Sequence, residues 1–345
     1  MEKLQIQKFG ITKDGSKPYL YKMKNDAGME VQVSDFGATL VNVTVLDQDK
    51  NPVEVVLGYE DAAGYENGTA AIGAIVGRNA NRIGVTINGI DYKLAENDGK
   101  NNLHSGPDVY QKRMWRVVEN GDDHVTFLLH SPDGDQGYPG ALDMKVTYTL
   151  DEENGLTIHY EAVPDQDTVI NMTNHSYFNL NGHKSGSVLH HRMQLLSDAF
   201  TPADAQSIPT GEVCSVDGTP MDFRSTKELG AEIDAAYEPL ILGNGYDHNW
   251  VLKNEGRFDK VAEVTGDESG IVMEVWTDRP GVQVYTANFL ENEAGRNGAV
   301  YQKRDAVCLE TQNYPDAVHQ KNFPEAICKK GETYDTKTAY RFHIE

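Results

Sequence analysis

The chain has few cysteines and no long apolar run, and each shortage argues against a class of protein. Three cysteines occur among 345 residues, at positions 214, 308 and 328, and none forms a Cys-x-x-Cys pair. This spacing argues against a disulfide scaffold or a zinc ribbon and favours a reducing compartment. No stretch approaches the roughly 18 apolar residues that span a bilayer, and residues 1–8 lack the apolar centre of a signal peptide. We therefore expect a cytoplasmic protein.

Basic residues are also scarce. Lys and Arg total 31 against 53 Asp and Glu, which gives a formal net charge of −22, and no basic cluster interrupts the acidic background. The charge argues against nucleic acid and anionic membranes as partners. It would also repel a phosphorylated substrate unless a local basic pocket held that substrate, whereas a neutral small molecule is indifferent to it. We expect a monomer or a homodimer.

Alternation of apolar and polar residues predicts short strands through most of the chain. Clear examples are residues 29–34, 39–46, 124–130, 144–150 and 282–287. Asn88-Gly89 and Asn154-Gly155 each separate two such runs, as hairpin turns do, so the strands should be mostly antiparallel. So long a series of strands cannot remain one open sheet. The predicted fold class is therefore all-β, a large antiparallel sandwich of stacked sheets.

The sequence contains few signals for helices and none for a domain boundary. Ser225 and Glu228 form a capping box that predicts a short helix to about Ala236. No repeat, low-complexity segment or Pro/Ser-rich linker divides the chain, so we expect one domain over residues 1–345.

The segment Asn171–Leu180 is a candidate site because its polar residues alternate. Read as a strand, it places His175, Tyr177 and Asn179 on one face. Such a face offers hydrogen-bond donors, an acceptor and an aromatic plane, which a hydroxyl-rich ligand needs. The alternative is an ordinary solvated or hydrogen-bonded histidine at a sheet edge.

A second candidate is the glutamate of the apolar segment Ala306–Pro315. Glu310 alternates there with Val307 and Leu309, and a carboxylate is costly to bury unless it is paired or takes part in chemistry. The alternative is an edge strand whose Glu310 faces water. Cys308 is a possible nucleophile, but a free buried cysteine usually acts as a small hydrophobic residue, and we interpret it so.

Other polar positions have a ligand-binding and a local structural interpretation. His104 lies in a polar loop, Asp247 follows an aromatic residue at a turn, and Gln283 shares a strand face with Tyr285. Each of these side chains either lines a pocket, or belongs to a turn or a solvent-exposed surface. The arginines of Gly77–Ile83 either bind a ligand or cap backbone carbonyls.

A metal site is a rival interpretation. His183, His190 and His191 lie close together, and Asp133-Gly134-Asp135 resembles the start of a calcium loop. The histidines lack paired spacing with a carboxylate, and the acidic loop lacks the glutamate at position twelve of an EF-hand. We therefore expect no metal.

Taken together, these segments resemble the aldose 1-epimerase, or galactose mutarotase, family. The similarity spans most of the chain, in family order, through 77–83, 101–106, 133–140, 174–180, 201–202 with 208–212, 245–250, 281–290, 309–324 and 334–342. It implies a large antiparallel β-sandwich that interconverts the α and β anomers of a free aldose, such as galactose or glucose, without a cofactor. By position, it implies His175 as general acid and Glu310 as general base. It implies that sugar hydroxyls are bound by Asn81, Arg82, His104, Tyr177, Asp247 and Gln283.

These residue types suit ring opening. At ordinary pKa values near 4.3 for Glu and 6.5 for His, the base is ionised and the acid partly protonated near neutrality. Two alternatives stay open: a hexose 6-phosphate 1-epimerase, which should add a basic phosphate pocket, and a sugar-binding protein that lacks catalysis.

Overall fold

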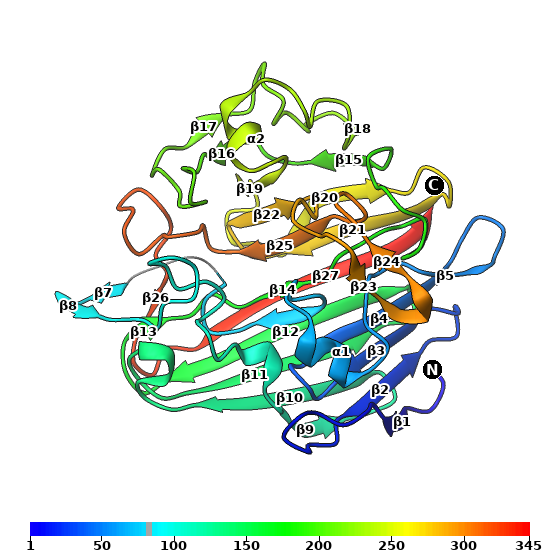
Figure 1. The fold of residues 1–345 in the computed structure, drawn as a ribbon, viewed down its shortest axis with the longest axis horizontal. Coiled ribbons are helices and arrows are strands. Elements are labelled where there is room, and N and C mark those ends of the chain that lie inside the picture. Colours follow the sequence, from blue (N-terminus) through cyan, green and yellow to red (C-terminus); the bar gives the residue numbers. More distant parts are fainter. Residues whose placement is uncertain (81–84) are drawn as a thin grey trace.

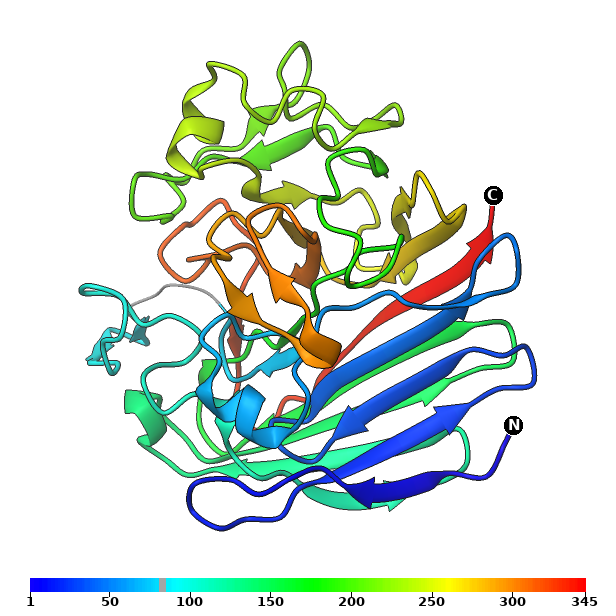
Figure 2. The same cartoon turned by 45° about the vertical axis from the view of Figure 1, so that its right-hand side comes forward.

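Strands pair into three main antiparallel sheets in the computed structural model, which describes residues 1–80 and 85–345. The N-terminal sheet has the order β1-β2-β3-β4-β5. Its strands are β1 (Gln5–Lys8), β2 (Tyr19–Lys24), β3 (Glu30–Ser34), β4 (Thr39–Leu46) and β5 (Pro52–Glu54). In Figures 1 and 2 these blue strands lie against the green and red strands of the largest sheet.

The largest sheet has nine strands in the order β18-β15-β20-β21-β27-β12-β11-β10-β9. They are β9 (Arg116–Asn120), β10 (His124–Ser131), β11 (Leu142–Leu150), β12 (Gly155–Pro164), β15 (Arg192–Leu195), β18 (Lys227–Glu228), β20 (Asp259–Thr265), β21 (Ile271–Thr277) and β27 (Tyr334–Ile344). Alternate side chains of β11 are buried, which matches the period-two pattern of its sequence. The rings of Tyr21 on β2 and Phe127 on β10 meet edge to face between the two sheets, 5.8 Å apart. The predicted stacked sandwich is thus confirmed.

A third sheet, in the order β17-β16-β19-β22-β25, carries several of the candidate residues. Its strands are β16 (Ala199–Thr201), β17 (Cys214–Ser215), β19 (Asp247–Val251), β22 (Gly281–Tyr285) and β25 (Cys308–Gln312). Every residue of β25 is buried. Tyr340 of β27 donates its hydroxyl to Leu309 O at 3.2 Å, which ties β25 to the large sheet.

The remaining elements are short. Two-stranded pairs join β6 (Ala74–Val76) to β14 (Thr173–His175), β7 (Val85–Ile87) to β8 (Ile90–Tyr92), β13 (Thr168–Val169) to β26 (Ile327–Cys328), and β23 (Glu293–Ala294) to β24 (Val300–Tyr301). The α-helices of the described residues are α1 (Ala62–Asn67) and α2 (Glu238–Leu242), and no helix there is long and apolar enough to cross a membrane. All three cysteines are free.

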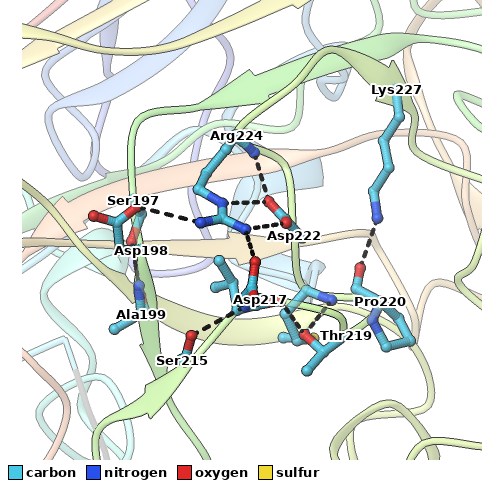
Figure 3. A network of polar contacts seen from close by, with 12 residues as sticks. Ser197, Asp198, Ala199, Ser215, Asp217, Thr219, Pro220, Asp222, Arg224 and Lys227 are labelled. Carbon is cyan, nitrogen blue, oxygen red and sulfur yellow. Dashed lines mark hydrogen bonds and ion pairs between the residues drawn. The ribbon is translucent and has the colours of Figure 1, made fainter.

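Two local predictions differ from the structure. The helix expected from Ser225 to Ala236 is wrong, because residues 227 and 228 instead form β18, which pairs with β15. Lys227 Nζ donates to Pro220 O at 2.9 Å, while neighbouring Arg224 binds Asp217 and Asp222, as Figure 3 shows. The pairing with β15 is a tertiary contact, and it overrides the local capping signal. The strand predicted over residues 171–180 shrinks to β14, beyond which Phe178 makes isolated bridges to Val56 and Val307.

Candidate active site

His175 and Glu310 meet although 135 positions separate them in the chain. Thr173 Oγ1 donates to Thr311 O at 3.0 Å, and so holds β14 beside β25. Each strand therefore projects its ionisable residue toward the other, with His175 Nε2 at 3.6 Å from Glu310 Oε1. Both residues are buried, with 6% and 5% of their surfaces exposed.

The pair lies in a cavity of about 400 Å³, a size suited to a small organic ligand. The candidates that share this cavity are His104, His175, Tyr177, Asp247, Gln283 and Glu310. Asn79 and Ala80 precede the candidates Asn81 and Arg82, which lie outside the described residues. Asn179 is directed elsewhere, since its amide donates to Gly186 O and Asp305 O.

The third sheet aligns the polar wall of the cavity. Register places Gln283 of β22 opposite Glu310, and Gln283 Nε2 donates to Asp247 Oδ1 at 2.8 Å. Within the described residues, the buried amide oxygens of Gln283 and Gln312 have no hydrogen-bond partner. Because buried polar atoms are normally paired, these oxygens are acceptors suited to ligand hydroxyls.

Aromatic rings support His175 from several sides. The ring of Tyr177 stacks on the imidazole with centroids 5.0 Å apart, while His104 and Tyr285 meet it edge to face at 5.5 and 6.0 Å. The hydroxyl of Tyr177 already donates to Ala70 O at 2.8 Å. Tyr177 therefore supports the imidazole with its ring.

The loop of His104 is held in an uncommon backbone form. His104 and Ser105 have φ values of 51° and 69°, in the left-handed region. Ser105 Oγ accepts the N–H of Asn79 at 2.8 Å and joins this loop to the 77–80 segment. Arg78 is fully buried and donates to Pro139 O and Gly140 O, so it caps carbonyls inside the protein rather than facing the cavity.

Burial shifts both members of the pair toward their neutral forms. Desolvation lowers the pKa of His175 from 6.5 to about 4. Desolvation, with a further contribution from the charge of Asp247, raises the pKa of Glu310 well above its usual value. The expectation of ordinary pKa values is thus wrong for this cavity, since the sequence does not reveal how deeply the two side chains lie. Between the two pKa values the pair holds one proton.

Several cavity residues were not singled out from sequence. Gln312, Phe289 and Glu293 line the cavity, and Phe289 is 65% exposed with its ring stacked on Tyr285. Gln312 follows the alternation of Glu310 on β25, a signal that was available. Phe289 lies in a loop, where no periodicity identifies it. Among the described residues, no group of three or more His, Cys, Asp or Glu side chains is arranged to hold a metal ion.

The family model described as aldose 1-epimerase matches residues 19–341. The chain belongs to the aldose 1-epimerase family. It is 42% identical over 330 residues to the galactose mutarotase of Bos taurus, an alignment that covers 94% of each chain. It is 37% identical over 341 residues to the aldose 1-epimerase of Escherichia coli, covering 97% of this chain and 98% of that protein.

Solved structures of related epimerases share the fold. The aldose epimerase homologue from C. elegans superposes with a TM-score of 0.88 at 30% identity, covering 94% of this chain and 98% of that one. The galactose 1-epimerase from Lactobacillus acidophilus gives a TM-score of 0.86 at 27% identity, covering 100% and 99%. This aldose 1-epimerase is therefore an isomerase with the galactose mutarotase fold.

Proposed function

We propose that this aldose 1-epimerase interconverts the α and β anomers of a free aldohexose with Glu310 as general base and His175 as general acid. The observation that carries the assignment is the pairing of these two side chains, 3.6 Å apart, inside a sugar-sized cavity. Galactose and glucose are the proposed substrates.

The reaction needs one proton moved at each end of a single bond. Glu310 takes the proton of the C1 hydroxyl while the bond from C1 to the ring oxygen breaks and His175 Nε2 gives its proton to that oxygen. The open-chain aldehyde rotates about the bond from C1 to C2. On reclosure His175 takes the proton back from the former ring oxygen, and Glu310 returns its proton to the oxygen on C1. The pair carries one proton throughout.

Burial favours the arrangement with the proton on Glu310 and a neutral His175, which is the state that follows ring opening. A C1 hydroxyl that donates a hydrogen bond to Glu310 stabilises the ionised carboxylate. Substrate binding thus favours an ionised Glu310 and a protonated His175, the arrangement from which ring opening begins.

We propose that His104, Asp247 and Gln283 bind sugar hydroxyls, together with Asn81 and Arg82. The Asp247–Gln283 hydrogen bond fixes both side chains at the cavity wall. Tyr177, whose hydroxyl is donated to Ala70 O, contributes its ring beside His175.

A free sugar suits the cavity better than a sugar phosphate. The described lining residues include the acidic side chains of Asp247, Glu291, Glu293 and Glu310, but neither Lys nor Arg. The negative charge of these described acidic side chains disfavours a phosphate. We further propose that residues 1–345 form one domain, supported by the extended core that the three main sheets share. We also propose that the protein is cytoplasmic, supported by its free cysteines.

The experiment is mutarotation of fresh α-D-galactose and α-D-glucose, followed by polarimetry. Glu310→Gln retains the shape of the side chain but removes the base, so we expect the rate to fall by ~10² to 10⁴. Glu161→Gln is the matched control, because Glu161 lies on β12 and pairs with Lys145 outside the cavity. Normal rates in Glu310→Gln would rule out its role as base, and binding of galactose by an inactive native protein would favour a sugar-binding protein.

A further inference from the structure

The imidazole of His175 has a second polar neighbour, at the nitrogen that does not face Glu310. Cys308 Sγ lies 3.6 Å from His175 Nδ1. Cys308 precedes Glu310 by two positions on β25, so both side chains project from the same face of that strand. Its side chain is fully buried, which places the sulfur in a fixed position between the strand and the imidazole.

We propose that Cys308 is a positioning residue for His175: its sulfur accepts a hydrogen bond from Nδ1–H and so keeps Nε2 as the nitrogen that exchanges a proton with the sugar. This inference rests on the proposed acid role of His175. In the reaction cycle Nε2 gives its proton to the ring oxygen and later takes it back. Nδ1 must keep its own proton through both steps, because a neutral imidazole with the proton on Nε2 has no lone pair there for reclosure.

Few atoms around the imidazole are placed to accept a hydrogen bond from Nδ1–H. It is surrounded by Tyr177 on its face, His104 and Tyr285 at its edges, Glu310 at Nε2, Cys308 at Nδ1 and its own backbone carbonyl. Tyr285 is engaged elsewhere, since its hydroxyl accepts the N–H of Phe289 at 3.1 Å. Cys308 is thus the side chain in hydrogen-bond contact with Nδ1.

A thiol suits this position better than a stronger acceptor. A carboxylate at Nδ1, as in a Ser-His-Asp triad, stabilises the imidazolium and makes its proton harder to give away. Sulfur is a weak acceptor. Burial, with the nearby charges of Glu310 and Asp247, raises the pKa of the Cys308 thiol, so it stays neutral rather than becoming a thiolate that would hold the proton on His175. The ring is oriented while its conjugate acid remains strong enough to protonate a weakly basic ring oxygen.

Cys308→Ala and Cys308→Ser in the full chain separate this role from simple packing. Loss of one hydrogen bond of ordinary strength should lower kcat roughly five- to tenfold in Cys308→Ala, with KM unchanged. Nitrogen-15 shifts of histidine-labelled Cys308→Ala should show a mixture of the two neutral tautomers of His175. The His175 signals are assigned by their loss in His175→Gln. Cys308→Ser supplies another acceptor and should restore the Nδ1–H form and most of kcat. Cys328→Ala is the control, because Cys328 contacts the carbonyls of Lys329 and Glu332 away from the cavity.

Wild-type kcat together with an unchanged Nδ1–H tautomer in Cys308→Ala would overturn the proposal, whatever the variant's melting temperature. It would also be overturned if Cys308→Ser lost as much activity as Cys308→Ala while both kept the wild-type tautomer. The tautomer of His175 is measured without substrate. Failure of the native protein to mutarotate any aldose would therefore refute the proposed function, while the Cys308 contact would still be read from the nitrogen shifts.

Discussion

Replacing His175 by glutamine should change how the protein's stability depends on pH. Because burial lowers the pKa of His175 from 6.5 to about 4, the unfolded chain binds a proton at this residue between those values and the folded chain does not. The folded state therefore loses stability as pH falls through this window. At about 1.36 kcal/mol per pKa unit, the full effect is about 3 kcal/mol, and about 2 kcal/mol of it appears between pH 7 and pH 5.

The assay is urea unfolding of the native protein and His175→Gln at pH 7 and pH 5. Since glutamine does not titrate, the variant should become about 2 kcal/mol more stable relative to the native protein when the pH is lowered. His191→Gln is the control, because His191 is buried outside the cavity lining, against Leu180 N and Asp267, with a pKa also lowered to about 4. It should show a similar stability shift while mutarotation continues. A difference in unfolding free energy that is the same at both pH values would refute the account of a buried neutral imidazole.

Further outcomes follow from the same geometry. A plot of kcat/KM against pH should be flat over a wide range, because activity falls only when the His175–Glu310 pair gains a second proton near pH 4 or loses its single proton above the raised pKa of Glu310. A sharp maximum near neutrality would contradict this. Glu310→Gln should also gain stability relative to the native protein as pH rises above the usual carboxylate range, since a raised folded pKa costs stability there; urea unfolding at pH 5 and pH 8 measures this, and no change would show that Glu310 ionises freely. Gln283→Leu removes a donor and an acceptor from the cavity wall, so KM for galactose should rise roughly five- to thirtyfold with a smaller change in kcat; Gln194→Leu, at a residue bonded to Arg224 O away from the cavity, is the control, and equal KM values would exclude a role for Gln283 in binding.

Local patterns predicted the strands because their cause is local. The residues of β4 coincide with the predicted run, and Asn88 and Gly89 have the positive φ values, 53° and 77°, that their hairpin turn requires. The capping box at Ser225 failed because pairing of β18 with β15, an earlier strand of the nine-stranded sheet, decided that segment.

The candidate site was predicted less completely, for a different reason. Residue types and family resemblance pointed to His175 and Glu310, but no periodicity predicts that Thr173 binds Thr311 and holds β14 beside β25. The sequence does not reveal how deeply these side chains are buried. Burial lowers the pKa of His175 from the ordinary value assumed from sequence. The sequence also does not reveal that Cys308, interpreted as a small hydrophobic residue, contacts the imidazole.

The central claim is that one bound sugar contacts both the imidazole of His175 and the carboxyl group of Glu310. A crystal structure of Glu310→Gln with galactose tests it most directly. We expect the ring oxygen within about 3 Å of His175 Nε2 and the C1 hydroxyl within about 3 Å of the side chain at position 310. A galactose bound in this cavity with its ring oxygen and C1 hydroxyl directed away from both groups, or bound elsewhere on the protein, would contradict the account.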